Sequence, residues 1–418
     1  MIDFEQAQAL VRTNAKRLPA ERVGIEEAVG RVLADDVVSG VALPPFDNSA
    51  MDGFALRSQA GPIAPGAHFA VDAEQSAGDA GQAVAGEGAC EIMTGARVPD
   101  GYDRVVPIEQ VEVERATDGR ALRIAVHATV PAGQHVRRAG EDIAVGEQVM
   151  RAGTRLGAPH VMVLAGLGLA EVAVVQRPRV ALLCTGRELL DDASQPLAPG
   201  RIRNTNGPYL RACLAELGAC LTHYETVPDQ PEAFADALAR ARATGADIVL
   251  STGAVSMGRY DFIPGVLDAL GATTLFHKVA MRPGKPLLFA RLDDGTLFFG
   301  LPGNPVSSVV GVRFFVEAAM RVMCGQPEER GWRLPLLHAV EKKAGFRLHQ
   351  KARVRLTADA RLGVELMTGQ ESFKTRPLLE SAVWAALPAS AARIAAGEVV
   401  DVFAPGSNGL VSLGDPSP

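Results

Sequence analysis

Between residues 180 and 323 the chain alternates short apolar runs with longer stretches of helical spacing, and this alternation limits the possible folds more than any other feature. The pattern predicts strands at 180–184, 220–226, 247–251, 273–279, 286–291 and 296–300, and helices at 207–217, 233–243, 263–270 and 305–323. Such alternation is typical of a mostly parallel, doubly wound α/β sheet. Ligands of such sheets bind beyond the carboxyl ends of the strands, so we expect the chemistry there.

The rest of the chain predicts three further units. Helical spacing at 4–18 and 26–34 opens an elongated, discontinuous domain, 1–43 plus 136–176, that regains a helix at 159–165 and a strand at 170–175. An inserted β domain is expected at 44–135, with strands at 104–113 and 121–126. The α/β domain then spans 177–326. A C-terminal β domain is expected at 327–418, with strands at 352–356 and 399–403.

Composition excludes several function classes. A net charge of −6 does not favour nucleic acid or an anionic membrane surface as a partner. The N-terminus lacks a signal-peptide pattern, and the best apolar run, 161–175, is too short to span a bilayer, so we expect a soluble cytoplasmic protein. The five cysteines form no C-x-x-C pair, and no zinc spacing or Ser-His-Asp signature is evident.

Two of the predicted strands end alike. Thr185-Gly186 and Thr252-Gly253 each place a hydroxyl and a glycine at the carboxyl end of a strand, where a backbone can approach a phosphate closely. Either pair alone is more often an ordinary turn. The second loop also carries Ser256 and Asp261, and that density of polar groups favours a ligand site.

Two later segments suit an oxyanion. Residues 281–286 hold Arg282 and Lys285 on a turn stiffened by Pro283 and Pro286, although a solvated basic turn explains them equally well. Residues 301–308 open a predicted helix, whose first turn binds anions. The residues concerned are Pro302, Gly303, Asn304, Pro305 and Ser307, with Asn304 equally explained as an N-cap.

Aspartates and glutamates in the loops form a candidate carboxylate set. Asp52 lies in a polar segment near the start of the inserted domain, and Glu188, Asp229 and Asp261 follow α/β strands. Mg²⁺ prefers oxygen ligands and substrate phosphates. Turn capping is the simpler role for any one of these carboxylates taken alone.

Taken together, the motifs at 44–55, 92–99, 137–143, 253–261, 281–286 and 301–308 resemble, in order and spacing, the MoeA family of molybdopterin molybdenumtransferases, which includes the E-domain of gephyrin. The resemblance covers essentially the whole chain. It implies four domains, of which the C-terminal one is β-barrel-like. It also implies an elongated homodimer whose cleft lies between the α/β domain of one subunit and the inserted domain of the other. Asp52 and Thr94 would then face the pocket from the partner subunit.

The resemblance also implies the reaction: adenylylated molybdopterin plus molybdate gives molybdenum cofactor and AMP, with Mg²⁺ at the phosphate bridge. Arg282, Lys285, Ser256 and Ser307 would hold molybdate, and Lys351 and Ser372 would add contacts from the C-terminal domain. Glu188, Asp229 and Asp261 would position the metal or a water. The remaining substrate-binding residues would be Thr185, Gly186, Asn206, Thr252, Gly253, Pro286, Pro302, Gly303, Asn304 and Pro305. A MogA-type adenylyltransferase and molybdoenzyme acceptors are the implied partners.

The sequence departs from the family pattern at Arg187, Ala254, Lys351 and Glu371, and Phe373 replaces a histidine. These changes leave two alternatives open. One is a molybdopterin-binding scaffold protein without turnover, and the other is a molybdopterin adenylyltransferase. The complete N- and C-terminal domains speak against the second alternative.

Overall fold

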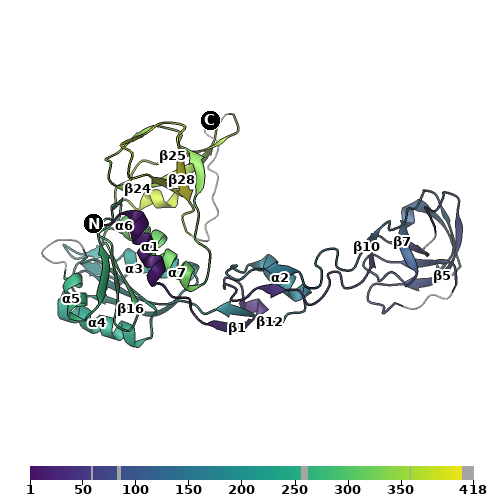
Figure 1. Ribbon diagram of the computed structural model, residues 1–418, viewed down its shortest axis with the longest axis horizontal. Coiled ribbons are helices and arrows are strands. Elements are labelled where there is room, and N and C mark those ends of the chain that lie inside the picture. Colours follow the sequence, from purple (N-terminus) through teal and green to yellow (C-terminus); the bar gives the residue numbers. More distant parts are fainter. Residues whose placement is uncertain (58–59, 82–85, 256–261, 358, 407–418) are drawn as a thin grey trace.

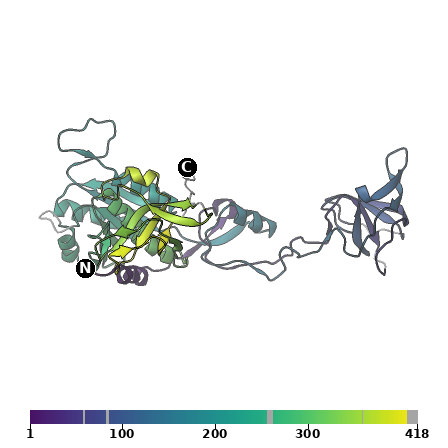
Figure 2. The ribbon, with the colours of Figure 1, turned by 90° about the horizontal axis from the view of Figure 1, so that it is seen from above.

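The computed structural model describes residues 1–57, 60–81, 86–255, 262–357 and 359–406. The molecule is elongated (Figures 1 and 2), with an α/β domain and a C-terminal β domain together at one end. A small middle unit follows, and a second β domain, here called the distal domain, stands at the other end. The predicted α/β multidomain class is therefore confirmed. Within the described residues, no helix is long and apolar enough to span a bilayer.

The α/β domain is built on a six-stranded sheet. Its order is β16 (Cys220–Val227), β13 (Arg179–Thr185), β17 (Ile248–Thr252), β21 (Leu297–Leu301), β20 (Leu288–Arg291) and β18 (Thr273–His277). The first four strands are parallel, but β20 and β18 are antiparallel to their neighbours. The connection from β20 to β21 is only five residues long, which permits a hairpin and not a crossover.

Helices cover both faces of this sheet. Val180, Leu182 and Cys184 of β13 face one core, while Ala181 and Leu183 face the other. The first core is covered by α3 (Asn206–Glu216) and by the long helix formed by α6 (Pro305–Gly311), a π-helical turn (Val312–Val316) and α7 (Glu317–Met323). The second core is covered by α4 (Pro231–Ala243) and α5 (Ile263–Ala269).

The N-terminal helix α1 (Phe4–Asn14) also packs on the first of these cores, through Phe4, Ala7 and Val11. It lies beside α6 and α7 in Figure 1. The segment predicted as 1–43 is therefore divided between two units, since residues 20–43 lie in the middle unit.

The middle unit pairs β1 (Ala20–Gly24) with β12 (Glu171–Val175), and β2 (Val37–Val38) with β11 (Gln148–Met150), beside α2 (Ala158–Gly166). The predicted helix at 26–34 is wrong. A 3₁₀ turn, Ile25–Glu27, ends before Gly30, whose φ of +80° breaks helical geometry. Val32 and Leu33 then form β-bridges with Arg155 and Val174, so sheet pairing replaces the expected helix.

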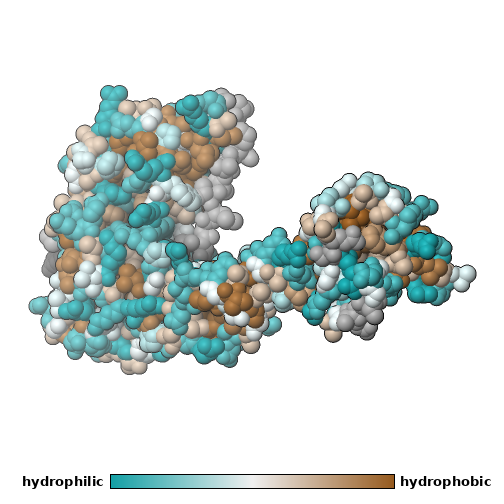
Figure 3. All heavy atoms as spheres, turned by 45° about the vertical axis from the view of Figure 1, so that its right-hand side comes forward, coloured by the Kyte–Doolittle hydropathy of each residue, from teal (hydrophilic) through white to brown (hydrophobic). Residues whose placement is uncertain are grey.

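Two chain segments join the middle unit to the distal domain, and we call them the connector (residues 43–49 and 135–143). They pair through β3 (Asn48–Ser49) and β10 (Val136–Arg137), and Leu43 bridges to Ile143. Asp47 accepts hydrogen bonds from the Ala139 N–H at 2.8 Å and from Arg138 Nη1 at 2.5 Å. The connector is narrow, and the distal domain stands apart from the α/β and C-terminal domains (Figure 3).

The distal domain is a six-stranded sheet. Its order is β7 (Tyr102–Pro107), β4 (Gly53–Arg57), β6 (Ala89–Ile92), β5 (His68–Gln75), β9 (Ala121–Val126) and β8 (Val111–Arg115). The single strand predicted at 104–113 is wrong, because a 3₁₀ turn, Ile108–Gln110, separates β7 from β8. The Ile108 N–H bonds to the carbonyl of Asp52, and this fixes the chain reversal beside Asp52.

The C-terminal domain is a curled sheet. Its order is β19 (Met281–Arg282), β24 (Arg347–Leu356), β26 (Val383–Leu387), β28 (Val399–Phe403) and β22 (Trp332–Pro335), with β25 (Leu362–Leu366) also on β24. A small pair, β23 (Val340–Glu341) and β27 (Arg393–Ile394), and a 3₁₀ turn, Arg376–Leu379, complete it. Because β19 comes from the α/β domain, the turn that carries Arg282 is tied directly to the C-terminal domain.

Candidate active site

A cavity of about 620 Å³ lies where the four parallel strands end. It is lined by Thr185, Gly186, Glu188, Leu189, Ile202, Arg203, Asn204, Thr205, Asn206, Asp229, Thr252, Gly253, Ala254, Gly303, Asn304, Pro305 and Phe373. The sheet order places β16 and β17 on opposite sides of β13, so the strand order reverses between β13 and β17. Such a switch point is where ligands of open α/β sheets bind.

The loops after β13 and β17 pack directly on each other. Thr185 Oγ1 donates to the carbonyl of Thr252 at 2.9 Å. Gly253 has a φ of +91°, and a Cβ at this position would lie 2.6 Å from Thr185 Oγ1, so only glycine fits. Ala254 follows with a φ of +51°, a left-handed conformation that is unfavourable for alanine. The loop therefore carries strain at the edge of the cavity.

Two of the four predicted carboxylates line the cavity. Asp229 Oδ2 accepts the N–H of Arg187 at 3.1 Å and so holds the turn after β13 against the turn after β16. Glu188 lies in that same turn and is half-buried. The Arg187 side chain is exposed and does not line the cavity. Asp261 lies outside the described residues, and among the described residues no cluster of three or more His, Cys, Asp or Glu side chains forms a ready-made metal site.

A polar network around the buried side chain of Asn204, at one edge of the cavity, was not anticipated from the sequence. Asn204 Nδ2 donates to Asp191 Oδ1 at 2.8 Å, and its Oδ1 accepts the Gly207 N–H at 2.9 Å. The Tyr224 hydroxyl also donates to Asp191, at 2.9 Å. Burial raises the pKa of Asp191, but hydrogen bonds from Thr226, Tyr224 and Asn204 outweigh this effect and lower the pKa below its ordinary value. Asn204 lies two residues before helix α3, where an asparagine often caps a helix. This position was the one sequence signal that could have identified it.

The network fixes the segment between β14 (Leu189–Leu190) and α3. β14 pairs with β15 (Ile202–Arg203), and the Asn204 N–H bonds to the Leu190 carbonyl at 3.1 Å. Asn206, at the start of α3, donates from Nδ2 to the carbonyl of Gly303 at 2.8 Å. These bonds join the rim on the β13 side to the segment that opens α6.

The start of α6 forms the opposite wall. Asn304 is the N-cap residue and Pro305 is the first helical residue, as predicted. The Asn304 side chain makes no capping hydrogen bond, so its amide is not used to close the helix. Pro302 is buried and its carbonyl accepts a hydrogen bond from the Ser308 hydroxyl. Gly303, Asn304 and Pro305 line the cavity, whereas Pro302 and Ser307 do not.

Arg282 and Lys285 lie beside one aromatic ring of the C-terminal domain. The Arg282 guanidinium carbon is 4.5 Å from the centroid of Phe346, and Lys285 Nζ is 5.8 Å from it. Both cations are exposed, and neither forms an ion pair with a carboxylate of the described residues. Two like charges that lie near one ring and pair with no described carboxylate suit an anion.

Contacts between the domains bring the other predicted oxyanion residues toward this turn. A Cβ at Gly284 would lie 3.4 Å from the carbonyl of Ser307, and Ser372 accepts the N–H of Val306 through its carbonyl at 3.0 Å. Lys351 is fully buried and donates from Nζ to the carbonyl of Lys374 at 3.2 Å. Burial lowers the pKa of Lys351. Pro286 is half-buried at the end of the turn.

Asp52 and Thr94 lie in the distal domain, at the far end of the molecule from the cavity (Figure 1). Asp52 Oδ1 accepts the Thr94 N–H at 2.7 Å and the Thr94 hydroxyl at 2.9 Å. These two hydrogen bonds lower the pKa of Asp52. The structure therefore pairs the two residues with each other but not with the other predicted site residues of the same chain. Ser256, like Asp261, lies outside the described residues.

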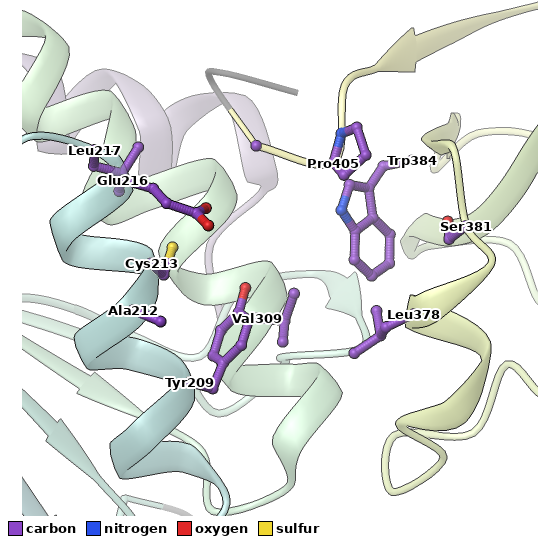
Figure 4. A pocket seen from close by; sticks show the side chains of 11 residues that line it. Tyr209, Ala212, Cys213, Glu216, Leu217, Val309, Leu378, Ser381, Trp384 and Pro405 are labelled. Carbon is purple, nitrogen blue, oxygen red and sulfur yellow. The ribbon is translucent and has the colours of Figure 1, made fainter. Parts of the chain in front are cut away.

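A second cavity, of about 590 Å³, lies between α3, α6 and the C-terminal domain. Tyr209, Cys213, Leu378 and Trp384 border it (Figure 4), and Glu216 is the one charged residue among its described lining residues. Burial raises the pKa of Cys213 to about 11, so its thiol is protonated near neutral pH. An apolar cavity with one anionic side chain does not suit an anionic substrate, and none of the predicted site residues lines it.

Comparison with known proteins agrees with this architecture. The fold and the site define a multidomain protein built around an α/β domain of the molybdopterin-binding type. Residues 181–322 match the family described as a probable molybdopterin binding domain, and residues 2–168 match the MoeA N-terminal region, domains I and II.

Individual relatives identify the family. The molybdopterin molybdenumtransferase of Synechococcus elongatus is 38% identical over 96% of this chain and 99% of its own length. That of Staphylococcus aureus is 36% identical over 78% of this chain and 77% of its own length. The crystal structure of the molybdopterin biosynthesis MoeA protein of Pyrococcus horikoshii matches 97% of this chain and 100% of its own, with a TM-score of 0.78 and 28% identity. The chain belongs to the MoeA family of molybdopterin molybdenumtransferases.

Proposed function

We propose that this protein inserts molybdenum into molybdopterin, using the adenylylated pterin and molybdate as substrates and releasing AMP. The single observation that carries the proposal is the position of two cations, Arg282 and Lys285, that pair with no carboxylate of the described residues. They lie on a turn of the α/β domain, which also forms the polar cavity at the sheet switch point. The cavity suits a phosphate-containing substrate and the cations suit an oxyanion.

We assign each of these side chains a role in the reaction from its position in the structure. Arg282 and Lys285 attract molybdate, with Ser307, Lys351 and Ser372 on the segments packed against their turn. This reduces the repulsion between molybdate and the anionic dithiolene. The loops at Thr185 and Thr252 hold the pterin and its phosphates. Water then cleaves the phosphoanhydride bond, so that AMP leaves and the other phosphate remains on the pterin.

A divalent cation fits the cavity. Glu188 and Asp229 supply two carboxylates on one rim, and Mg²⁺ is usually held by one or two carboxylates together with substrate phosphates. When bound, Mg²⁺ would neutralise charge on the phosphoanhydride. Asp261 is the third carboxylate that we assign to this role.

The distance between the cavity and Asp52 supports a homodimer in which the distal domain of one subunit completes the site of the other. We place this dimer in the cytoplasm, where a MogA-type adenylyltransferase supplies the pterin and molybdoenzymes accept the product.

The test is AMP release from adenylylated molybdopterin by the purified protein, with and without molybdate and Mg²⁺. We expect release that depends on molybdate and falls at least about 100-fold in Asp52→Ala, the range for loss of an acid–base group. Asp100→Ala, an exposed carboxylate of the same domain, is the matched control. AMP release that is indifferent to molybdate, or equal losses in both variants, would count against the insertase.

A further inference from the structure

Phe373 is an exposed aromatic residue at the entrance to the cavity. Its exposure is 65%, yet it lines the cavity together with Asn304 and Pro305. It is the only aromatic residue among the described residues that line this space. An apolar ring left in water at the edge of an otherwise polar cavity is unfavourable until something covers it.

The backbone on both sides of Phe373 is fixed in place. The Ser372 carbonyl accepts the N–H of Val306, in the first turn of α6, at 3.0 Å. On the other side, the Lys374 carbonyl accepts a hydrogen bond from buried Lys351 at 3.2 Å. Lys374 also pairs with Glu371, at 2.7 Å. The backbone therefore holds residue 373 at the rim before any ligand arrives, which lowers the backbone entropy lost on binding. Lys374 Nζ lies 6.0 Å from the centroid of the Phe373 ring.

We propose that Phe373 is a stacking platform for a planar heteroaromatic ring of the substrate, and that it contributes to specificity for that ring. This inference rests on the proposed function, because the adenylylated pterin carries two such rings, the adenine and the pterin. The other described lining groups are glycines, hydroxyls, amides, aliphatic side chains and a few charged groups, so Phe373 supplies the only aromatic face among them. Base–aromatic stacking tolerates either heterocycle.

Binding measurements separate the two rings. Dissociation constants for AMP, for 6-hydroxymethylpterin and for ribose 5-phosphate would be measured by calorimetry in EDTA, on the full-length wild type and on Phe373→Ala, Phe373→Leu and Phe373→Tyr. We expect Phe373→Ala to weaken binding of AMP or of the pterin about 5- to 100-fold. Phe373→Leu should show an intermediate loss, and Phe373→Tyr should remain within about twofold of wild type. Ribose 5-phosphate, which has no planar ring, should bind equally to all four proteins.

Two outcomes would overturn the platform: unchanged affinity of Phe373→Ala for both ring compounds, or an equal loss for ribose 5-phosphate, which would mean that the loop had moved. Since the side chain is exposed, the unfolding temperature of each variant should match wild type. The proposed reaction is tested separately by AMP release. If wild type shows Phe373-dependent binding but no molybdate-dependent AMP release, the platform stands and the insertase does not. If AMP release is normal but all three affinities are independent of Phe373, the insertase stands and the stacking platform does not.

Discussion

Ala254 adopts a left-handed backbone conformation, with a φ of +51°, next to Gly253 at +91°. For an L-residue this conformation costs about 1–2 kcal/mol, which is partly offset because alanine restricts the unfolded chain more than glycine does. We therefore predict that Ala254→Gly raises the free energy of unfolding of the α/β domain by about 0.5–1 kcal/mol. Urea denaturation followed by circular dichroism would measure the change.

The matched control for this prediction is Ala198→Gly, in an exposed loop where φ is not positive. There glycine only increases the freedom of the unfolded chain, so the control should lose about 0.4–1 kcal/mol. Equal destabilisation by both substitutions would show that the conformation of Ala254 is not strained.

Arg187 and Glu188 are adjacent but have different surroundings. Glu188 lines the cavity, whereas the Arg187 side chain is exposed. The backbone of Arg187 makes its contacts, since its N–H donates to Asp229 and its carbonyl accepts a hydrogen bond from Arg201. We predict that Glu188→Gln lowers kcat at least about tenfold, while Arg187→Ala changes it less than about threefold. Steady-state AMP release at saturating substrate would show the difference. A large loss in Arg187→Ala would mean that this departure from the family pattern affects catalysis directly.

The sequence motifs identified the site residues that lie within them. They did not identify residues that reach the cavity only because the chain is folded. Ten predicted residues line the cavity, because each follows a strand or opens a helix whose position the strand–helix alternation predicts. Asn204 and Asp191 were not identified. Their role depends on Tyr224, a residue of a different strand, and that contact has no signature in local sequence.

Among the secondary-structure elements, the long strands and helices of the α/β domain were predictable because burial on both faces leaves clear apolar runs. The incorrect secondary-structure predictions lie where a turn interrupts an apolar pattern. At 26–34 the spacing of Ala28, Val32 and Leu33 suits a helix. The 3₁₀ turn nevertheless ends at Glu27, the positive φ of Gly30 breaks helical geometry, and β-bridges follow. The antiparallel direction of β20 was likewise set by its short connection to β21 and not by strand composition.

The connector between the middle unit and the distal domain depends on Asp47. A hydrogen bond from the Ala139 N–H and the ion pair with Arg138 lower the pKa of Asp47 below 3.8. A lowered carboxyl pKa contributes stability above the unfolded value, and this contribution is lost as the pH falls through the lower, folded pKa. We predict that Asp47→Ala speeds hydrogen exchange of residues 136–143 about three- to tenfold at neutral pH, a modest effect because the pair is partly exposed.

The pH profile adds a second criterion for the same variant. In wild type, the protection of residues 136–143 should decrease only below pH 3.8, whereas Asp47→Ala should show no such step. Asp35→Ala, an exposed carboxylate of the middle unit, should behave as wild type. If the step persisted in Asp47→Ala, another carboxylate would have to hold the connector together.

At the scale of the whole molecule, the sequence indicated how many units there are but not how far apart they lie. Composition and periodicity describe each unit separately, while the separation of the distal domain is set by the connector and its few pairings. That separation has a chemical consequence. Within one chain, Asp52 and Thr94 lie far from the cavity lined by Glu188 and Asp229 (Figures 1 and 2). If Asp52 and Thr94 act at that cavity, as we propose, a second copy of the chain must supply them.

This requirement can be tested by mixing two inactive variants. Asp52→Ala removes a group from the distal domain, and Lys285→Ala removes one from the α/β domain. If each site combines the α/β domain of one subunit with the distal domain of the other, a mixed dimer has one site with both defects and one with neither. Random reassortment of equal amounts makes half of the dimers mixed, so we predict recovery of about one quarter of wild-type AMP release, proportional to the fraction of mixed dimers. A site formed within one chain would recover nothing, because every chain would still carry one defect.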